Sequence, residues 1–158
     1  MIRNYQHGDH HAIASIFSKA IHEIACDVYT LEQCNAWSEK KPNPEHWEKR
    51  CAKKNPFVFI KDERVVGFLE LDSDGHIDCL YVHPQETRKG IASALIDHAV
   101  KASMKLGLTR VFVEASICAK PVFEKKGFIV TREQQVSLRG ETLINYMMEN
   151  TKLSPALS

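Results

Sequence analysis

The chain has 158 residues and a mass of 18.0 kDa, which suits a single domain. Hydrophobic residues make up 44% and charged residues 26%, as in ordinary globular proteins. The formal charge of +1 argues against a nucleic-acid-binding protein, because that class carries a clear basic excess. The apolar runs are too short to span a membrane, and the first residues lack the apolar stretch of a signal peptide. We therefore expect a cytoplasmic protein without membrane contact.

The cysteines and histidines do not follow a metal-binding pattern. Five cysteines, an odd number without a CxxC pair, are expected to be reduced thiols that mostly serve as small core residues. The segment His7-Gly8-Asp9-His10-His11 has no second cluster of ligands downstream. We therefore interpret Asp9 as a helix cap beside solvated histidines, and we expect no metal.

Helical patterns dominate the first third of the chain. An apolar helical face extends from residue 13 to 24. Thr30 and Gln33 have the spacing of a capping box, which predicts a short second helix. Pro44 follows a capping asparagine and predicts a third helix over residues 45–53. The basic run that ends this helix and the charged cluster 39–41 are interpreted as solvated surface, and an acidic partner is the alternative for the basic run.

The period changes to that of strands after residue 56. Three strands are expected over residues 57–60, 65–71 and 76–82, followed by a helix over 90–106 and a strand over 111–114. A short helix over 119–126 and a hairpin of strands 128–138 and 142–148 complete the chain. This order predicts an α/β fold of the α+β type, a mixed sheet with helices on both faces. We expect one domain over residues 1–150 and a flexible tail over 151–158.

The stretch between the third strand and the long helix predicts an anion site. A buried strand ends at Val82, a loop with positive charge and small residues follows, and a helix begins at Gly90. Free N–H groups at a helix start, with the positive end of the helix dipole, bind phosphates. Arg88 and Lys89 supply counter-charge, while Gly90 and Ala92 let a ligand approach the backbone. A plain strand–loop–helix turn is the alternative.

This stretch resembles the GNAT superfamily of acyl-CoA N-acyltransferases. Residues 87–92, Thr-Arg-Lys-Gly-Ile-Ala, follow its signature Gln/Arg-x-x-Gly-x-Gly/Ala, with Val82-His83-Pro84 upstream. Residues 119–128 are similar to the family's later helix that ends in Gly-Phe, and the order of elements matches over about residues 1–149. The resemblance implies a mostly antiparallel sheet with a splay between central strands.

The chain departs from the family pattern at two positions. Thr87 stands where the family prefers Gln or Arg, although Arg88 is adjacent. Phe123 stands where many members have a tyrosine that protonates the departing thiolate. One alternative is that another group supplies that proton, and Tyr146 is a candidate. The other is that the thiolate leaves unassisted, because a thiol pKa of about 8.5 makes the thiolate a tolerable leaving group.

The resemblance implies acetyl-CoA as co-substrate. Its pyrophosphate is expected on the N–H groups of residues 88–93, and its pantetheine arm beside the backbone of Leu80 and Val82. An N–H near Tyr81 is expected to stabilise the developing oxyanion. The residues expected to bind the cofactor are Leu80, Tyr81, Val82, Thr87, Arg88, Lys89, Gly90, Ile91, Ala92, Ser93, Ser116, Ala119 and Phe123.

The resemblance also implies direct acetyl transfer to a primary amine of a small molecule, peptide or protein, and this amine requires a base. Strand alternation predicts that His76, Asp78, Leu80 and Val82 share one face, with Cys79 opposite. Family members carry their base at positions matching His76 or Asp78, and an ordinary surface pair is the alternative. Glu70 and Glu114 are second choices.

The acceptor side is expected among the first helices. Tyr29, Trp37 and Trp47 are candidates for an aromatic wall or for ordinary packing, and Glu70 is a further substrate-binding candidate. A catalytically weak acyl-CoA-binding or interaction module is the alternative function, and a phosphate binder of another family is a third. The resemblance admits a homodimer, although no sequence feature sets the oligomeric state.

Overall fold

The computed structural model describes residues 1–38 and 41–153. Its seven-stranded sheet has the order β1-β2-β3-β4-β5-β7-β6. The strands are β1 (Ile2–Asn4), β2 (Phe57–Lys61), β3 (Arg64–Leu71), β4 (His76–Val82), β5 (Val111–Ala115), β6 (Ile129–Leu138) and β7 (Glu141–Asn150). Among the described strands, neighbours are antiparallel except β4 and β5, which are parallel. The predicted mixed, mostly antiparallel sheet is confirmed.

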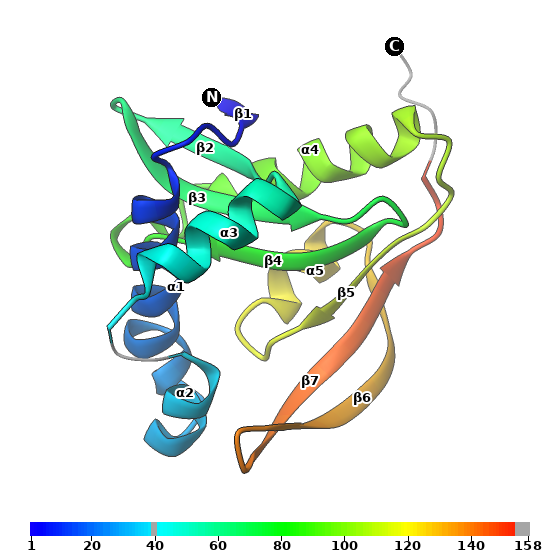
Figure 1. Ribbon diagram of the computed structural model, residues 1–158. Coiled ribbons are helices and arrows are strands. Elements are labelled where there is room, and N and C mark those ends of the chain that lie inside the picture. The colour runs from blue at the N-terminus through cyan, green and yellow to red at the C-terminus, as the bar shows by residue number, and fades with distance from the viewer. Residues whose placement is uncertain (39–40, 154–158) are drawn as a thin grey trace.

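Helices cover both faces of the sheet (Figure 1). In front of it lie α1 (His10–Glu23), α2 (Leu31–Trp37) and α3 (Pro44–Lys54), and behind it lie α4 (Ile91–Lys105) and α5 (Lys120–Lys125). Two short 3₁₀ helices, η1 (Ala25–Asp27) and η2 (Pro84–Glu86), join these elements. No helix in the described part of the chain is long and apolar enough to cross a bilayer.

The helix starts follow the local capping patterns. Thr30 and Gln33 form the predicted capping box, and Asn43 accepts a hydrogen bond from the His46 N–H at the start of α3. Asp9 occupies the capping position of α1, but its carboxylate makes no cap bond to that helix. It accepts instead from Arg3 and from the Gln6 N–H, so the predicted side-chain cap is wrong.

Two apolar layers hold the helices on the sheet. The layer behind the sheet joins α4 and α5 to the strands through residues such as Leu69, Ile77, Leu95 and Phe123. The layer in front includes Ile13, Ile16, Trp47, Val58 and Phe68. Burying each such large side chain stabilises the fold by about 1.5–3 kcal/mol. The two layers make β3 and β4 the buried centre of the molecule.

The sheet opens between β4 and β5. These strands pair only at His76 with Phe112 and at Ile77 with Val113, and then diverge (Figure 1). On its other edge β5 pairs with β7 over its whole length. The Tyr29 hydroxyl accepts from the Ile117 N–H and donates to the Ile144 carbonyl, which ties the segment after β5 to β7. The splay implied by the resemblance is therefore present.

Two sequence-based expectations fall partly outside the described residues. These are residues 154–158 of the predicted tail, and Glu39 and Lys40 of the charged cluster. The short strand β1 was not predicted, because three residues carry no readable periodicity.

Candidate active site

A β-bulge in β4 places Asp78 at the mouth of the splay. Glu70 of β3 pairs with Cys79, and the next residue, Leu71, pairs with Ile77, so Asp78 is an extra residue in β4. The bulge shifts the side-chain alternation by one position. Leu80 therefore packs with Ile77 in the layer behind the sheet, while Asp78 contacts helix α3 in front.

The predicted common face of four side chains on β4 is wrong for this reason. Leu80 and Val82 pack against the layer behind the sheet. Asp78 and Cys79, predicted on opposite faces, both lie within reach of the Arg50 guanidinium, at 3.1 and 3.5 Å. The bulge thus brings Asp78 to the helix-covered front of the sheet.

The backbone of β4 presents free hydrogen-bonding groups to the splay. The His83 N–H donates to the Val66 carbonyl at 2.8 Å, so these two residues form a hydrogen-bonded pair of the antiparallel β3–β4 ladder. Going back along β4 from His83, hydrogen-bonded and non-hydrogen-bonded residues alternate. Tyr81 and Cys79 are then the residues bonded to β3, and the amides of Leu80 and Val82 point the other way. Since β5 has diverged there, these amides face the opening rather than a neighbouring strand.

Two cavities meet at β4. The smaller, of about 60 Å³, lies in the splay and is lined, in β5, in α5 and in the segment between them, by residues that include Glu114, Ser116, Ala119 and Phe123. The larger, of about 540 Å³, lies under α1 and α3 and beside the β6–β7 turn. Four residues line both cavities: Trp37, Asp78, Cys79 and Tyr81. The arrangement offers two entrances to one point on β4.

The loop from β4 to α4 has the geometry of an anion site. Gly90 caps α4 with a φ of +81°, and a methyl group built on it would meet no atom within 4 Å. Arg88 also has a positive φ, of 63°. The first N–H groups of α4 have no partner within the helix, as at any helix start. The open space at Gly90 leaves room for a phosphate at these groups.

The side chains of this loop have unequal roles. The Lys89 ammonium pairs with Glu86, and the Thr87 hydroxyl donates to the Pro84 carbonyl. Ile91 is buried in the layer behind the sheet rather than facing a ligand. Arg88 and Lys89 are both exposed, but Lys89 is paired with Glu86.

A cluster of charges joins α3 to the sheet beside Asp78. Glu70 is fully buried, and its carboxylate accepts three hydrogen bonds from Arg50, the shortest at 2.6 Å. The Lys54 ammonium donates to both Asp72 and Asp78 at 2.8 Å. The hydrogen bonds that Arg50 donates to Glu70 hold the pKa of Arg50 above its usual range despite burial. The interpretation of this basic run as solvated surface is therefore wrong for Arg50 and Lys54.

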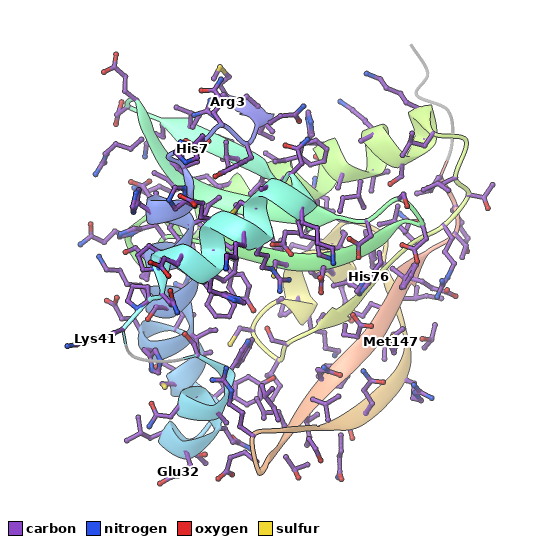
Figure 2. All side chains as sticks on the ribbon, in the orientation of Figure 1. Arg3, His7, Glu32, Lys41, His76 and Met147 are labelled. Atoms are coloured by element: carbon purple, nitrogen blue, oxygen red, sulfur yellow. The ribbon has the colours of Figure 1, made fainter. Side chains whose placement is uncertain are left out.

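His76 lies at the point where β4 meets β5 (Figure 2). Its two ring nitrogens contact Asp72 at 3.2 Å and Glu114 at 2.5 Å, and the ring stacks on Phe112. Burial disfavours the charged ring, but the bonds to Glu114 and Asp72 outweigh it and raise the pKa of His76. His76 itself lines neither cavity and reaches the smaller one only through Glu114.

The thiols near the splay are not activated. Burial, reinforced by the negative charge of Glu70, raises the pKa of the Cys79 thiol well above its usual value. Burial also raises the pKa of Cys118. Both groups are therefore neutral thiols at pH 7, and a thiol is a poor nucleophile compared with a thiolate.

Comparison with known proteins identifies the family. A family model described as "Acetyltransferase (GNAT) domain" matches residues 25–150. The uncharacterized N-acetyltransferase YafP of Escherichia coli K12 is 37% identical over 147 residues, which cover 93% of each chain. The chain belongs to the GNAT acetyltransferase family. It is thus an acetyltransferase, as its resemblance predicted.

Solved GNAT structures share the fold. A GCN5-related N-acetyltransferase from Rhodopseudomonas palustris is 30% identical, with a TM-score of 0.89 over 96% of this chain and 94% of that chain. YncA of Salmonella typhimurium, solved with its cofactor acetyl-CoA, has a TM-score of 0.72 over 100% of this chain and 96% of that chain. At 16% identity, the likeness to YncA shows the fold alone.

Of the remaining residues predicted for this GNAT site, some line a cavity and others do not. Phe123 is buried and lines the smaller cavity, where it packs against Phe128. Trp37 lines both cavities, and its indole N–H donates to the Tyr81 hydroxyl at 3.2 Å. Tyr29 and Tyr146 line neither: the Tyr29 hydroxyl is held by main chain, and Tyr146 lies on β7 opposite Ala115. Glu70 lies beneath Arg50, outside both cavities.

The sequence reasoning missed the residues that only packing brings to the site. Arg50, Lys54 and Cys79 surround Asp78, and Leu138 and Arg139 of the β6–β7 turn wall the larger cavity. Arg50 and Lys54 are four residues apart and therefore share one face of α3. That spacing is the signal that could have indicated a common acidic partner.

Proposed function

We propose that the chain transfers the acetyl group of acetyl-CoA to a primary amine of a small molecule, peptide or protein, by direct attack in a ternary complex. The observation that carries this proposal is the meeting of two cavities at Asp78, Cys79 and Tyr81. A thioester entering through the splay and an amine entering beneath α1 and α3 would meet at that point.

The donor side is supported by the backbone geometry. The N–H groups at the start of α4 would hold the pyrophosphate, with Arg88 as a counter-charge. The outward-facing amides of Leu80 and Val82 would pair with the amides of the pantetheine arm as an added strand would. An N–H of this stretch would also stabilise the negative oxygen that develops on the thioester carbonyl.

Asp78 is the titratable residue that we propose as the base. It lines both cavities, and its contacts with Arg50 and Lys54 both go to Oδ2. In the step, the carboxylate takes a proton from the ammonium group, directly or through water. The neutral nitrogen attacks the thioester carbon, the C–S bond breaks, and CoA leaves as a thiolate, while the nitrogen loses its second proton to water as the amide forms. The alternative base, His76, would act through Glu114.

Direct attack is supported by the state of the thiols. A covalent intermediate would need a nucleophile at the junction, and Cys79 is the residue that lies there. Its raised pKa keeps it protonated at neutral pH. Phe123 cannot protonate the departing thiolate, which would take its proton from solvent, as its pKa of about 8.5 permits.

Calorimetric titration with acetyl-CoA and, separately, with CoA tests the proposal first. We expect binding of both, followed by amine-dependent release of thiol when a panel of amines is added. Binding without thiol release for any amine would favour an acyl-CoA-binding module. Failure to bind either compound at millimolar concentration would overturn the proposal.

A further inference from the structure

Three metal-ligating groups converge on a surface away from the splay. His7 precedes α1, His10 is the first residue of α1, and Glu48 lies on α3 (Figure 2 labels His7). One ligand atom of each lies within 4.8 Å of the other two. We propose that His7, His10 and Glu48 form a site for a divalent transition-metal ion of the zinc class.

Two of the distances between the ligand atoms match the edges of a tetrahedral zinc site. The Glu48 Oε2 lies 3.3 Å from His7 Nε2 and 3.4 Å from His10 Nε2. Zinc bonds of about 2.0–2.1 Å in a tetrahedron require ligand atoms about 3.3–3.4 Å apart. A charged hydrogen bond would be shorter, at about 2.7–2.9 Å. The spacing of Glu48 from both histidines is therefore compatible with a shared ion, and the ligand atoms of the two histidines lie within 4.8 Å of one another.

His10 is built into the protein as an oriented ligand. Its residue is only 3% exposed, yet its Nε2 faces the Glu48 carboxylate at the surface. Its other ring nitrogen, Nδ1, lies 3.2 Å from the Tyr5 hydroxyl. When Nδ1 carries the proton and donates to Tyr5, the lone pair of Nε2 is directed to the cluster. Metal-binding histidines are typically oriented by a partner of this kind.

The turn that carries the two histidines is also held in place. The Asp9 carboxylate accepts from the Arg3 guanidinium at 2.7 Å and from the Gln6 N–H at 2.8 Å. Both contacts are made outside α1, so Asp9 braces the turn between His7 and His10. The expected solvated histidines are wrong for His10, and the second ligand cluster missing from the sequence is supplied by α3.

The donor set indicates which ions fit. Two imidazole nitrogens and one carboxylate suit Zn²⁺, Co²⁺ or Ni²⁺, whereas Mg²⁺ and Ca²⁺ prefer oxygen ligands throughout. The His7 and Glu48 side chains are 81% and 51% exposed, so a fourth position is open to water. A bound ion would join α1 to α3, the two helices that wall the larger cavity.

Metal titration of tag-free protein without acetyl-CoA tests this site separately from catalysis. We expect one equivalent of Zn²⁺ to bind by calorimetry, and Co²⁺ to give the visible absorption bands of a tetrahedral complex. His7→Ala and Glu48→Gln should each weaken binding at least about tenfold, and Tyr5→Phe about tenfold. His7 is exposed, so its variant should fold normally, as circular dichroism would verify.

His46→Ala is the matched control, because His46 is an exposed histidine on the same helix as Glu48 but outside the cluster. We expect it to bind Zn²⁺ as the wild type does. Equal weakening by His46→Ala and His7→Ala would indicate non-specific surface binding and overturn the proposal. Absence of Zn²⁺ binding by the wild type would overturn it as well.

Discussion

Asp78 shows how one inserted residue changes the chemistry of a strand. Because it is the bulged residue of β4, it escapes the alternation that would have placed it beside Leu80. It lies instead at the junction of both cavities, with Arg50 and Lys54 on one carboxylate oxygen. Bulges often direct a side chain toward an active site in this way.

Asp78→Asn should therefore lower kcat while acetyl-CoA affinity stays nearly the same. An amide cannot accept the ammonium proton, and loss of a general base reduces the rate by about a hundredfold. Steady-state kinetics and calorimetry measure the two quantities. Asp97→Asn, an exposed carboxylate on α4, is the control. An unchanged kcat in Asp78→Asn would exclude this residue as the base.

His76 should make the stability of the fold depend on pH. Its pKa is raised in the folded protein, so its bonds to Glu114 and Asp72 contribute fully below the unfolded pKa of about 6.5. This contribution is lost as the pH rises through the folded value. We expect His76→Gln to reduce the unfolding free energy by about 1–2 kcal/mol at pH 6 and by less at pH 9. Urea denaturation at both pH values measures this, and an equal loss at both would contradict it.

At the scale of elements, the start of α4 and the loop before it act together. Gly90 has a positive φ and open space around it, and Gly107 at the other end of α4 has the same two properties. The two glycines therefore differ in what they face rather than in their backbone strain. Gly90 faces the proposed phosphate site.

Gly90→Val should weaken CoA binding by about tenfold or more, because the side chain would occupy the space of a phosphate and remove its N–H contacts. Gly107→Val should lower stability similarly but leave CoA affinity unchanged. Calorimetry for binding and thermal denaturation for stability separate the two effects. Equal CoA affinity in the two variants would reject residues 88–93 as the pyrophosphate site.

Helix α3 is anchored to the sheet by a buried charge. Arg50→Met should destabilise the fold by about 3–5 kcal/mol, because it leaves the Glu70 carboxylate buried without its partner. Adding Glu70→Gln should recover part of this loss, since no full charge then stays buried. Lys49→Met, at an exposed neighbour, is the control. Urea denaturation measures the unfolding free energy of both variants. An equal loss in Arg50→Met and Lys49→Met would contradict the role of Arg50 as an anchor.

At the scale of the whole molecule, the larger cavity is assembled from distant segments. Phe17 and Trp47 come from α1 and α3, Tyr81 from β4, and Lys41 and Arg139 from two loops. The three aromatic residues form a cluster: the ring centroid of Phe17 lies 4.9 Å from that of Trp47 and 4.9 Å from that of Tyr81. The cavity therefore combines an aromatic wall with basic side chains.

These cations should bias the enzyme toward amines that also carry a carboxylate. We expect such amines to have a kcat/KM several-fold above that of polyamines, because each exposed charge contact contributes up to about 1 kcal/mol. Changing both Lys41 and Arg139 to Gln should reduce the ratio. Thiol-release assays over matched amines measure it. A preference for polyamines in the wild type would contradict this view of the cavity.

The sequence by itself determined the features that depend on neighbouring residues. Helix and strand periodicity, the capping box at Thr30, the turn at residues 139–140 and the loop and helix start at 88–93 are local patterns, and the structure has each of them. The two GNAT motifs added the fold and the acetyltransferase activity. None of these required knowledge of how the elements pack.

Only the tertiary structure decided which distant side chains meet. The bulge at Asp78 depends on how β4 pairs with β3, and it reverses the faces that simple alternation predicts. Arg50 reaches Glu70, and Glu48 reaches His7, because α3 crosses the front of the sheet beside α1. These contacts join residues 20 and 41 positions apart. Periodicity reports which side of its own element a residue occupies, and packing determines what that side meets.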